Sequence, residues 1–238
     1  ELDGVRCINS FRPSSLTTAD TAYTDEGVAA IKLVKSHIDT LAGGRPEVVK
    51  ALTGWMAYNV QNPGRKIRWA PLVKGVEGDG KTLLGRVMSA VLGQVNVKEI
   101  SPKVLGTDFT AWATGACIGV LEELRMAGHN RHDIYNALKP YVTNDSVAIH
   151  AKGKDEYNAP NTMNYIAFTN HADALPLSDN DRRYMVIFTP FNSTSDLQKA
   201  VGETGAYFDA LYAAIVKQRT QLRRWLDVSR LVDGFKPN

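Results

Sequence analysis

Hydrophobic residues recur at two different spacings along this chain of 238 residues. Between residues 26 and 61 they fall three or four positions apart, which predicts two amphipathic helices separated by the helix-breaking stretch AGGRPE. From residue 67 short apolar runs alternate with helical stretches, the pattern of a parallel sheet covered by helices. After residue 196 the helical spacing returns, with an apolar stripe and a basic face.

The fold class that follows is α/β, a parallel sheet flanked by helices with a small N-terminal helical bundle. Five apolar runs predict its strands, near residues 69–74, 96–100, 116–122, 163–169 and 184–189. We divide the chain into four parts, namely a lead-in at 1–25, a helical bundle at 26–65, an α/β core at 66–195 and a helical segment at 196–238.

A glycine-rich loop follows the first predicted strand and precedes a helical pattern. Its sequence GVEGDGKT starts at Gly75 and fits the spacing G-x-x-x-x-G-K-[ST]. In such loops backbone N–H groups wrap a β-phosphate, the lysine (Lys81) reaches the β and γ oxygens, and the hydroxyl of Thr82 ligates Mg²⁺. The flanking strand and helix favour this interpretation over a glycine turn without a ligand. We therefore predict ATP and Mg²⁺ as cofactors, held by Gly75, Gly78, Asp79, Gly80, Lys81, Thr82 and Leu83.

Paired carboxylates end the third predicted strand, in the stretch ACIGVLEELRM. This strand starts about as far downstream as a P-loop sheet needs for a second strand beside the first. A hydrolysing enzyme needs one acid to hold hydrated Mg²⁺ and another to polarise the attacking water. We assign Glu122 to the metal and Glu123 to the water, with their order left open. The alternative is a strand end meeting a helix start, where acids favour the helix dipole.

Two further polar positions are candidates for contact with the γ-phosphate. Asn170 ends the strand NYIAFTN, which we place between the cradle and the acid pair; a turn-forming Asn is the alternative. Arg182 and Arg183 precede the last strand. Paired arginines are often only solvated, but one of the two could serve as an arginine finger that stabilises charge on the phosphate of a neighbouring subunit. A finger of this kind requires a closed ring of copies.

A basic hairpin is predicted between the acid pair and Asn170. Two β-prone runs flank AKGKD, with Lys152 and Lys154 at the tip and Gly153 at the bend. His150 is close enough in sequence to join them. A basic tip suits sequence-independent contact with the phosphates of DNA in a ring channel, whereas exposed lysines serve solubility in the alternative interpretation.

Composition adds limits on partners and compartment. The net charge of +3 and the pI of 8.8 are too mild to establish a polyanionic partner, so the positions of the basic residues matter more than their number. Cys7 and Cys117 lie far apart without a CxxC pair, which favours a reduced, cytoplasmic compartment. No apolar run approaches the length of a membrane span, and no signal peptide opens the chain, so we expect no membrane partner.

Other enzyme classes lack their motifs in this sequence. His129 and His132 have neither H-E-x-x-H order nor nearby cysteines, which argues against zinc. No G-x-S-x-G motif and no convincing Cys/His nucleophile pair occurs. Because the chain opens with Glu1 in a stretch that looks internal, we expect an excised domain of a longer protein.

Taken in order, these motifs resemble the superfamily III helicases, an AAA+ group. The resemblance is strongest to the phage and plasmid primase-helicase proteins related to the poxvirus nucleoside-triphosphatase primase. It rests on GVEGDGKT, LEEL, LKPYVTNDSVAIHAKGKDEY, YIAFTN and NDRRYMVI, and it covers about residues 45–190 well and the ends loosely. Glu122 stands where many relatives carry Asp, and both acids can hold hydrated Mg²⁺.

The resemblance implies a P-loop AAA+ fold and a ring, usually hexameric, that hydrolyses ATP between subunits. Such rings move single-stranded or forked DNA, typically in the 3′ to 5′ direction, and a primase or polymerase domain often lies upstream. Carried onto this chain, the catalytic roles fall to Lys81, Glu122, Glu123, Asn170, Arg182 and Arg183, with Thr82 and Glu122 at the metal and His150, Lys152 and Lys154 on DNA.

The expected function is therefore an ATP-dependent DNA helicase or translocase domain in phage or plasmid replication, working in the cytoplasm of the bacterial host. Two rivals stay open. One is a DNA-binding assembly module of a primase, in which nucleotide sets the oligomeric state and little unwinding is done. The other is a P-loop kinase acting on a small molecule, for which the basic hairpin has no purpose.

Overall fold

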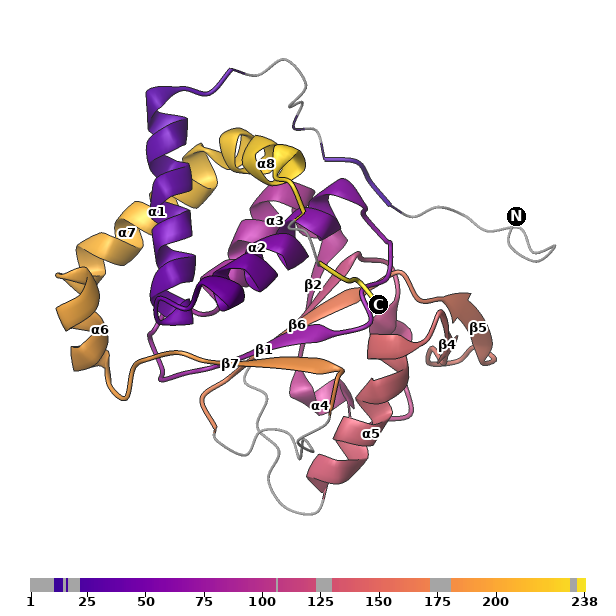
Figure 1. Ribbon diagram of the computed structural model, residues 1–238. Helices are drawn as coiled ribbons and strands as arrows, with labels where there is room; N and C mark the ends of the chain where they lie inside the picture. Colours follow the sequence, from indigo (N-terminus) through magenta and orange to yellow (C-terminus); the bar gives the residue numbers. More distant parts are fainter. Residues whose placement is uncertain are drawn as a thin grey trace.

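The computed structural model describes residues 11–14, 16, 22–105, 107–122, 130–171, 181–231 and 235–238, with residues 130–134 described by backbone alone. The predicted α/β fold with a parallel sheet flanked by helices is confirmed (Figure 1). Cys7 lies outside the described residues, and Cys117 is a buried free thiol. None of the helices in the described ranges has the length and apolarity that a membrane span needs.

The first two helices match the predicted pattern closely. α1 (Asp25–Ala42) begins at Thr24, whose hydroxyl accepts a hydrogen bond from the Gly27 N–H, and it ends at Gly43 with φ of 64°. These are the usual signals of a helix start and a left-handed helix end. α2 (Pro46–Gln61) has proline at its first position, where the ring is pre-organised and no intrahelical N–H bond is lost.

Five parallel strands form the central sheet, in the spatial order β2-β3-β6-β1-β7. Their bounds are β1 Ala70–Lys74, β2 Val97–Ile100, β3 Ile118–Leu121, β6 Asn164–Thr169 and β7 Tyr184–Phe188. Each falls within one residue or two of its predicted position. β6 lies between β1 and β3, as predicted for the strand that ends at Asn170, so the acid-bearing β3 is not the direct neighbour of β1.

Two hydrophobic clusters cover the two faces of this sheet. On one face α1, α2 and three later helices pack together, and the strand residues Val73, Ile118 and Phe168 join them in one cluster. On the other face a short helix and a longer one cover Leu72 and Tyr165 (Figure 1). The remaining helices are α3 Leu83–Leu92, α4 Pro102–Leu105, α5 Asn130–Thr143, α6 Thr194–Val201, α7 Thr204–Lys217 and α8 Arg219–Val228.

The predicted hairpin is a separate two-stranded antiparallel sheet, β4 (Ser146–Ile149) with β5 (Tyr157–Pro160). It leaves the main sheet at the amino end of β6, because β5 leads directly into that strand. Gly153 bends its tip with φ of 73°. The hairpin therefore stands at one edge of the sheet, while the glycine-rich loop after β1 stands at the opposite, carboxyl edge.

Candidate functional site: a cleft at the carboxyl edge of the sheet

The glycine-rich loop joins the carboxyl end of β1 to the start of α3. Gly78 and Gly80 adopt φ of 78° and 84°, a left-handed conformation that favours glycine. The helix begins at once, since the Leu83 N–H already donates to the Gly80 carbonyl oxygen at 3.0 Å. The dipole of a helix favours anions at its N-terminus, so the local fold is suited to phosphate.

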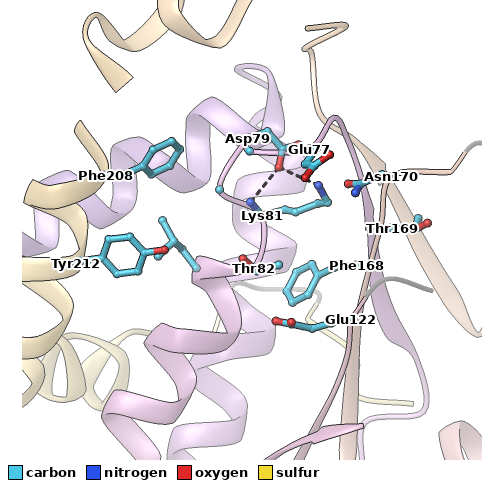
Figure 2. Close-up of a pocket in the computed structure, with 13 residues that line it drawn as sticks. Glu77, Asp79, Lys81, Thr82, Glu122, Phe168, Thr169, Asn170, Phe208 and Tyr212 are labelled. Atoms are coloured by element: carbon cyan, nitrogen blue, oxygen red, sulfur yellow. Dashed lines mark hydrogen bonds and ion pairs between the residues drawn. The ribbon is translucent and has the colours of Figure 1, made fainter. Parts of the chain in front are cut away.

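Asp79 ties the loop together from inside. One carboxylate oxygen accepts the Lys81 backbone N–H and pairs with the Lys81 ammonium, both at 3.1 Å. The other accepts the hydroxyl of Thr189, at the end of β7, at 3.0 Å. Asp79 is fully buried, and the Lys81 ammonium also donates to the Val76 carbonyl oxygen at 2.8 Å. The lysine is therefore folded back onto its own loop, as Figure 2 shows.

A buried histidine fixes the loop from the opposite side. His37 of α1 contacts the Gly80 carbonyl oxygen through Nε2 at 3.0 Å and the Tyr207 hydroxyl of α7 through Nδ1 at 2.9 Å. Since a carbonyl oxygen only accepts, Nε2 carries the proton and the Tyr207 hydroxyl donates to Nδ1. Burial lowers the pKa of His37, against smaller opposing effects of Gly80 and Asp79. The neutral imidazole therefore links α1, α7 and the loop.

The loop forms the floor of a cleft of about 310 Å³. The carboxyl ends of β3 and β6 supply one wall, which carries Glu122, Thr169 and Asn170. The aromatic side chains Phe208 and Tyr212 of α7 lie on the other side of the loop, opposite that polar wall (Figure 2). The lining residues are Glu77, Gly78, Asp79, Gly80, Lys81, Thr82, Leu83, Glu122, Phe168, Thr169, Asn170, Phe208 and Tyr212.

Most of the sequence-predicted cofactor residues line this cleft. Glu122 and Asn170 reach it from two neighbouring strands, as expected when the carboxyl ends of parallel strands meet at one edge. The hydroxyl of Thr82 and the carboxylate of Glu122 are hard oxygen donors of the kind that Mg²⁺ prefers, so the residues present fit that ion. Glu123 lies outside the described residues.

The two predicted arginines lie away from the cleft. Arg182 is exposed, and Arg183 is half-buried and pairs with Asp181 at 3.6 Å. Both precede β7, and Tyr184 at its start pairs with Ala70 at the start of β1. The loop follows the other end of β1, which is roughly 15 Å away along a five-residue strand. The structure therefore does not bring these arginines to the cleft of their own chain.

The predicted DNA-contact residues cluster on the hairpin. Lys152 and Lys154 are exposed at its tip. His150 lies half-buried where β4 enters the tip, and its backbone N–H donates to the Thr110 hydroxyl at 2.8 Å. Phe109, 43 % exposed, packs its ring 5.2 Å from that of His150 and was missed at the sequence level, because an isolated aromatic in a polar loop carries no periodic signal.

A buried lysine anchors the base of the hairpin. The Lys66 ammonium donates to the carbonyl oxygens of Tyr141 and Met163 at 2.5 Å and lies 5.0 Å from the centre of the Tyr165 ring. Burial lowers the pKa of Lys66 to about 7. The end of α5 and the start of β6 are thereby joined at one point, so the hairpin has a fixed base.

Within the part of the chain that the structure describes, no group of three or more histidine, cysteine, aspartate or glutamate residues is placed to hold a metal ion, and the expectation against zinc stays a prediction. His129 lies outside the described residues, as does the side chain of His132.

Comparison with known proteins links this chain to a phage protein. Residues 73–183 match a family of unknown function, DUF5906. The chain is 24% identical over 189 residues to the DNA primase-polymerase of Nitratiruptor phage NrS-1, a match that covers 79% of this chain and 25% of that protein. It therefore spans about a quarter of the length of this curated relative.

Solved structures of the same phage protein share the fold. The apo structure of the NrS-1 C-terminal region superposes with a TM-score of 0.77 at 21% identity, covering 97% of this chain and 52% of that one. A second apo structure of this region gives a TM-score of 0.75. The fold described above is thus that of about half of the NrS-1 C-terminal region.

Proposed function

We propose that this chain is the ATPase core of a DNA helicase or translocase that acts in phage or plasmid replication, as part of a primase-helicase protein. The observation that carries the proposal is the cleft, which gathers Lys81, Thr82, Glu122 and Asn170 from three separate segments of the chain. The similarity to a phage primase-polymerase supports a place in DNA replication.

The topology supports a P-loop ATPase of the AAA+ type. In such a site the phosphate-binding loop follows one strand of the sheet. The neighbouring strand carries a polar sensor residue at its end, and the strand beyond that one carries the acids. Here β6 and β3 fill those places, and Asn170 and Glu122 directly follow them. In our proposal Lys81 holds the β- and γ-phosphates, Thr82 and Glu122 hold Mg²⁺, and Asn170 orients water. Bound Mg²⁺ would neutralise charge on the phosphates.

The position of the arginines supports a ring. Arg182 and Arg183 stand at the amino edge of the sheet, so they could reach a phosphate only in the cleft of another copy. We propose a head-to-tail ring, with six copies as the expected number, in which one of these guanidinium groups completes the neighbour's site. A primase or polymerase domain upstream in the full protein is part of the same proposal.

Single-stranded DNA would contact the hairpin. Lys152 and Lys154 would neutralise phosphates, with His150 and Phe109 offering ring faces beside them. β6 connects the two regions, because it is buried along its whole length and runs from the hairpin base to Asn170 in the cleft. A shift of the hairpin on hydrolysis would travel through this strand.

The test is steady-state ATP hydrolysis at high protein concentration, with and without single-stranded DNA. We expect stimulation by DNA and a loss of at least about 100-fold in Lys81→Ala, because the group that contacts transferring phosphate is removed. Lys50→Ala, an exposed lysine of α2, is the matched control and should hydrolyse normally. Normal turnover in Lys81→Ala would refute the proposal.

Mixing variants separates the proposal from an assembly module. The first variant is Lys81→Ala, and the second combines Arg182→Ala with Arg183→Ala. Each should be inactive alone. Mixing the two should restore part of the activity, because some interfaces then join an intact cleft to an intact arginine pair. Hydrolysis indifferent to DNA, with no restoration on mixing, would favour the nucleotide-controlled assembly module.

A further inference from the structure

The cleft has a second wall that none of the proposed phosphate chemistry uses. Phe208 and Tyr212 lie four residues apart on α7, so both rings point from the same helix face toward the loop (Figure 2). Glu122 and Asn170 stand opposite. A ligand held by this cleft would therefore meet carboxylate and amide groups on one side of the loop and aromatic rings on the other.

The two rings differ in how they are held. Phe208 packs against Tyr207 at 5.4 Å and His37 at 6.4 Å between ring centres, and a side chain on Gly80 would come within 2.6 Å of its ring. It is thus wedged against the loop. Tyr212 is 41 % exposed, and the guanidinium of Arg86 lies 5.3 Å from its ring centre.

We propose that Phe208 and Tyr212 form a stacking wall for the base of the nucleotide whose phosphates the loop holds, and that this wall accepts adenine and guanine alike. The inference rests on the proposed nucleotide-binding function of the loop. A nucleotide has a charged end, its phosphates, and a flat aromatic end, its base. The phosphates match the polar side of the cleft, and the base matches the aromatic wall.

Tolerance of the base follows from how stacking works. Every base has a π-face, so stacking on an aromatic side chain holds bases without distinguishing them. Discrimination requires hydrogen bonds to the base edge, which reject the wrong partner by leaving polar groups unpaired. Of the cleft-lining side chains that α7 supplies, the Tyr212 hydroxyl is the one polar group. The Arg86 guanidinium stacks on the Tyr212 ring but does not line the cleft, and the other polar lining groups belong to the loop and the sheet.

The experiment compares ligands with and without a base. Calorimetric titration of the full chain with ADP, GDP and inorganic pyrophosphate, each with Mg²⁺, gives three dissociation constants per variant. For the native chain we expect ADP and GDP to agree within about threefold. Tyr212→Leu, which keeps apolar bulk without a π-face, should weaken ADP and GDP about tenfold and leave pyrophosphate unchanged.

Further variants serve as controls for Tyr212→Leu. Tyr212→Phe retains the ring and should retain ADP affinity. Phe208→Leu should behave like Tyr212→Leu toward ADP, and Val216→Ala, an exposed apolar residue one turn along α7 and outside the cleft lining, is the matched control. Circular dichroism of each variant checks that α7 is intact.

Three results would overturn the inference. Equal weakening of pyrophosphate and ADP in Tyr212→Leu would mean general damage to the loop, and unchanged ADP affinity would mean that the ring does not touch the base. A preference between ADP and GDP above about thirtyfold would mean that the base edge is read. If the native chain bound none of the three probes, the proposed function itself would fail, which is a distinct result.

Discussion

Two glycine-bearing loops carry the lysines to which we assign ligand contacts, and the two loops differ in how their lysines are held. The loop after β1 is held by buried groups, with Asp79 buried and Lys81 only 5 % exposed. The hairpin tip has Lys152 and Lys154 in the open, and a side chain on Gly153 would meet nothing within 4 Å.

The difference teaches what each loop can recognise. A template fixed by buried hydrogen bonds suits a ligand of constant shape, such as a chain of phosphates, because little reorganisation is needed on binding. A basic tip without fixed partners suits a polyanion whose sequence and shape vary. Substitutions at the first loop should therefore reduce the free energy of unfolding, whereas those at the second should leave it unchanged.

The largest effect on stability is expected at Asp79. Asp79→Ala leaves the Lys81 ammonium without its carboxylate and the Thr189 hydroxyl without its acceptor. We expect a loss of about 3 kcal/mol in the free energy of unfolding, measured by urea denaturation. Asp79→Asn, which keeps the acceptor oxygen, should lose less. Equal stability of Asp79→Ala and the native chain would show that the loop is not tied through this residue.

A matched pair of glycine substitutions compares the two loops directly. Gly80 and Gly153 both have positive φ, so alanine at either costs roughly 1 kcal/mol of backbone strain. At Gly80 the new methyl group would also lie 2.6 Å from Phe208 and 2.7 Å from His37, which adds about 2 kcal/mol of overpacking. Gly80→Ala should therefore lower the melting temperature several degrees more than Gly153→Ala; similar losses would contradict the comparison.

The loop should also respond to pH through His37. Because burial lowers the pKa of this imidazole in the folded state, the unfolded chain binds the proton more tightly. The stabilising effect of the neutral ring is complete above pH 6.5 and is lost as pH falls toward the lowered value, by up to about 1.4 kcal/mol per pH unit.

The measurement is the free energy of unfolding between pH 5 and pH 8. The difference between the native chain and His37→Gln should shrink as the pH falls through this window. Tyr207→Phe removes a hydrogen-bond partner but leaves the imidazole, and it should keep the native slope. Parallel curves for His37→Gln and the native chain would rule out this origin of the pH dependence.

The smallest effect on stability is expected at the hairpin tip. Lys152→Ala combined with Lys154→Ala should change the free energy of unfolding by less than about 0.5 kcal/mol, because both side chains are exposed. Affinity for single-stranded DNA should fall, and the slope of log affinity against log salt should become shallower by about 0.7 for each lysine that contacts a phosphate. An unchanged salt slope would make these lysines ordinary surface charge.

Local pattern was sufficient to predict the strands, most helices and the two loops. The apolar positions in strand runs such as YIAFT, and in the helical pattern after Glu26, are largely the positions that are buried in the structure. The motif from Gly75 to Thr82 is likewise contiguous, so its loop needed no knowledge of the rest of the chain.

Contacts between distant segments were not predictable in this way. Thr189 lies 110 residues from Asp79, and Tyr207 lies 170 residues from His37. A lone histidine or threonine on an apolar face gives no sign of its partner until the helices and strands are packed. The aromatic wall was not predicted for a related reason, because in the sequence Phe208 and Tyr212 belong to an ordinary apolar stripe of a helix.

The position of β1 between β6 and β7 also constrains how the molecule is made. Leu72 pairs with Ala167 on one side and Val186 on the other, and the Arg68 N–H donates to the carbonyl oxygen of Pro237, near the end of the chain. A ribosome must therefore release the chain as far as β6 before β1 gains its first neighbour, and as far as β7 before it gains the second. Such a high contact order slows folding and leaves β1 exposed to non-native pairing while synthesis continues.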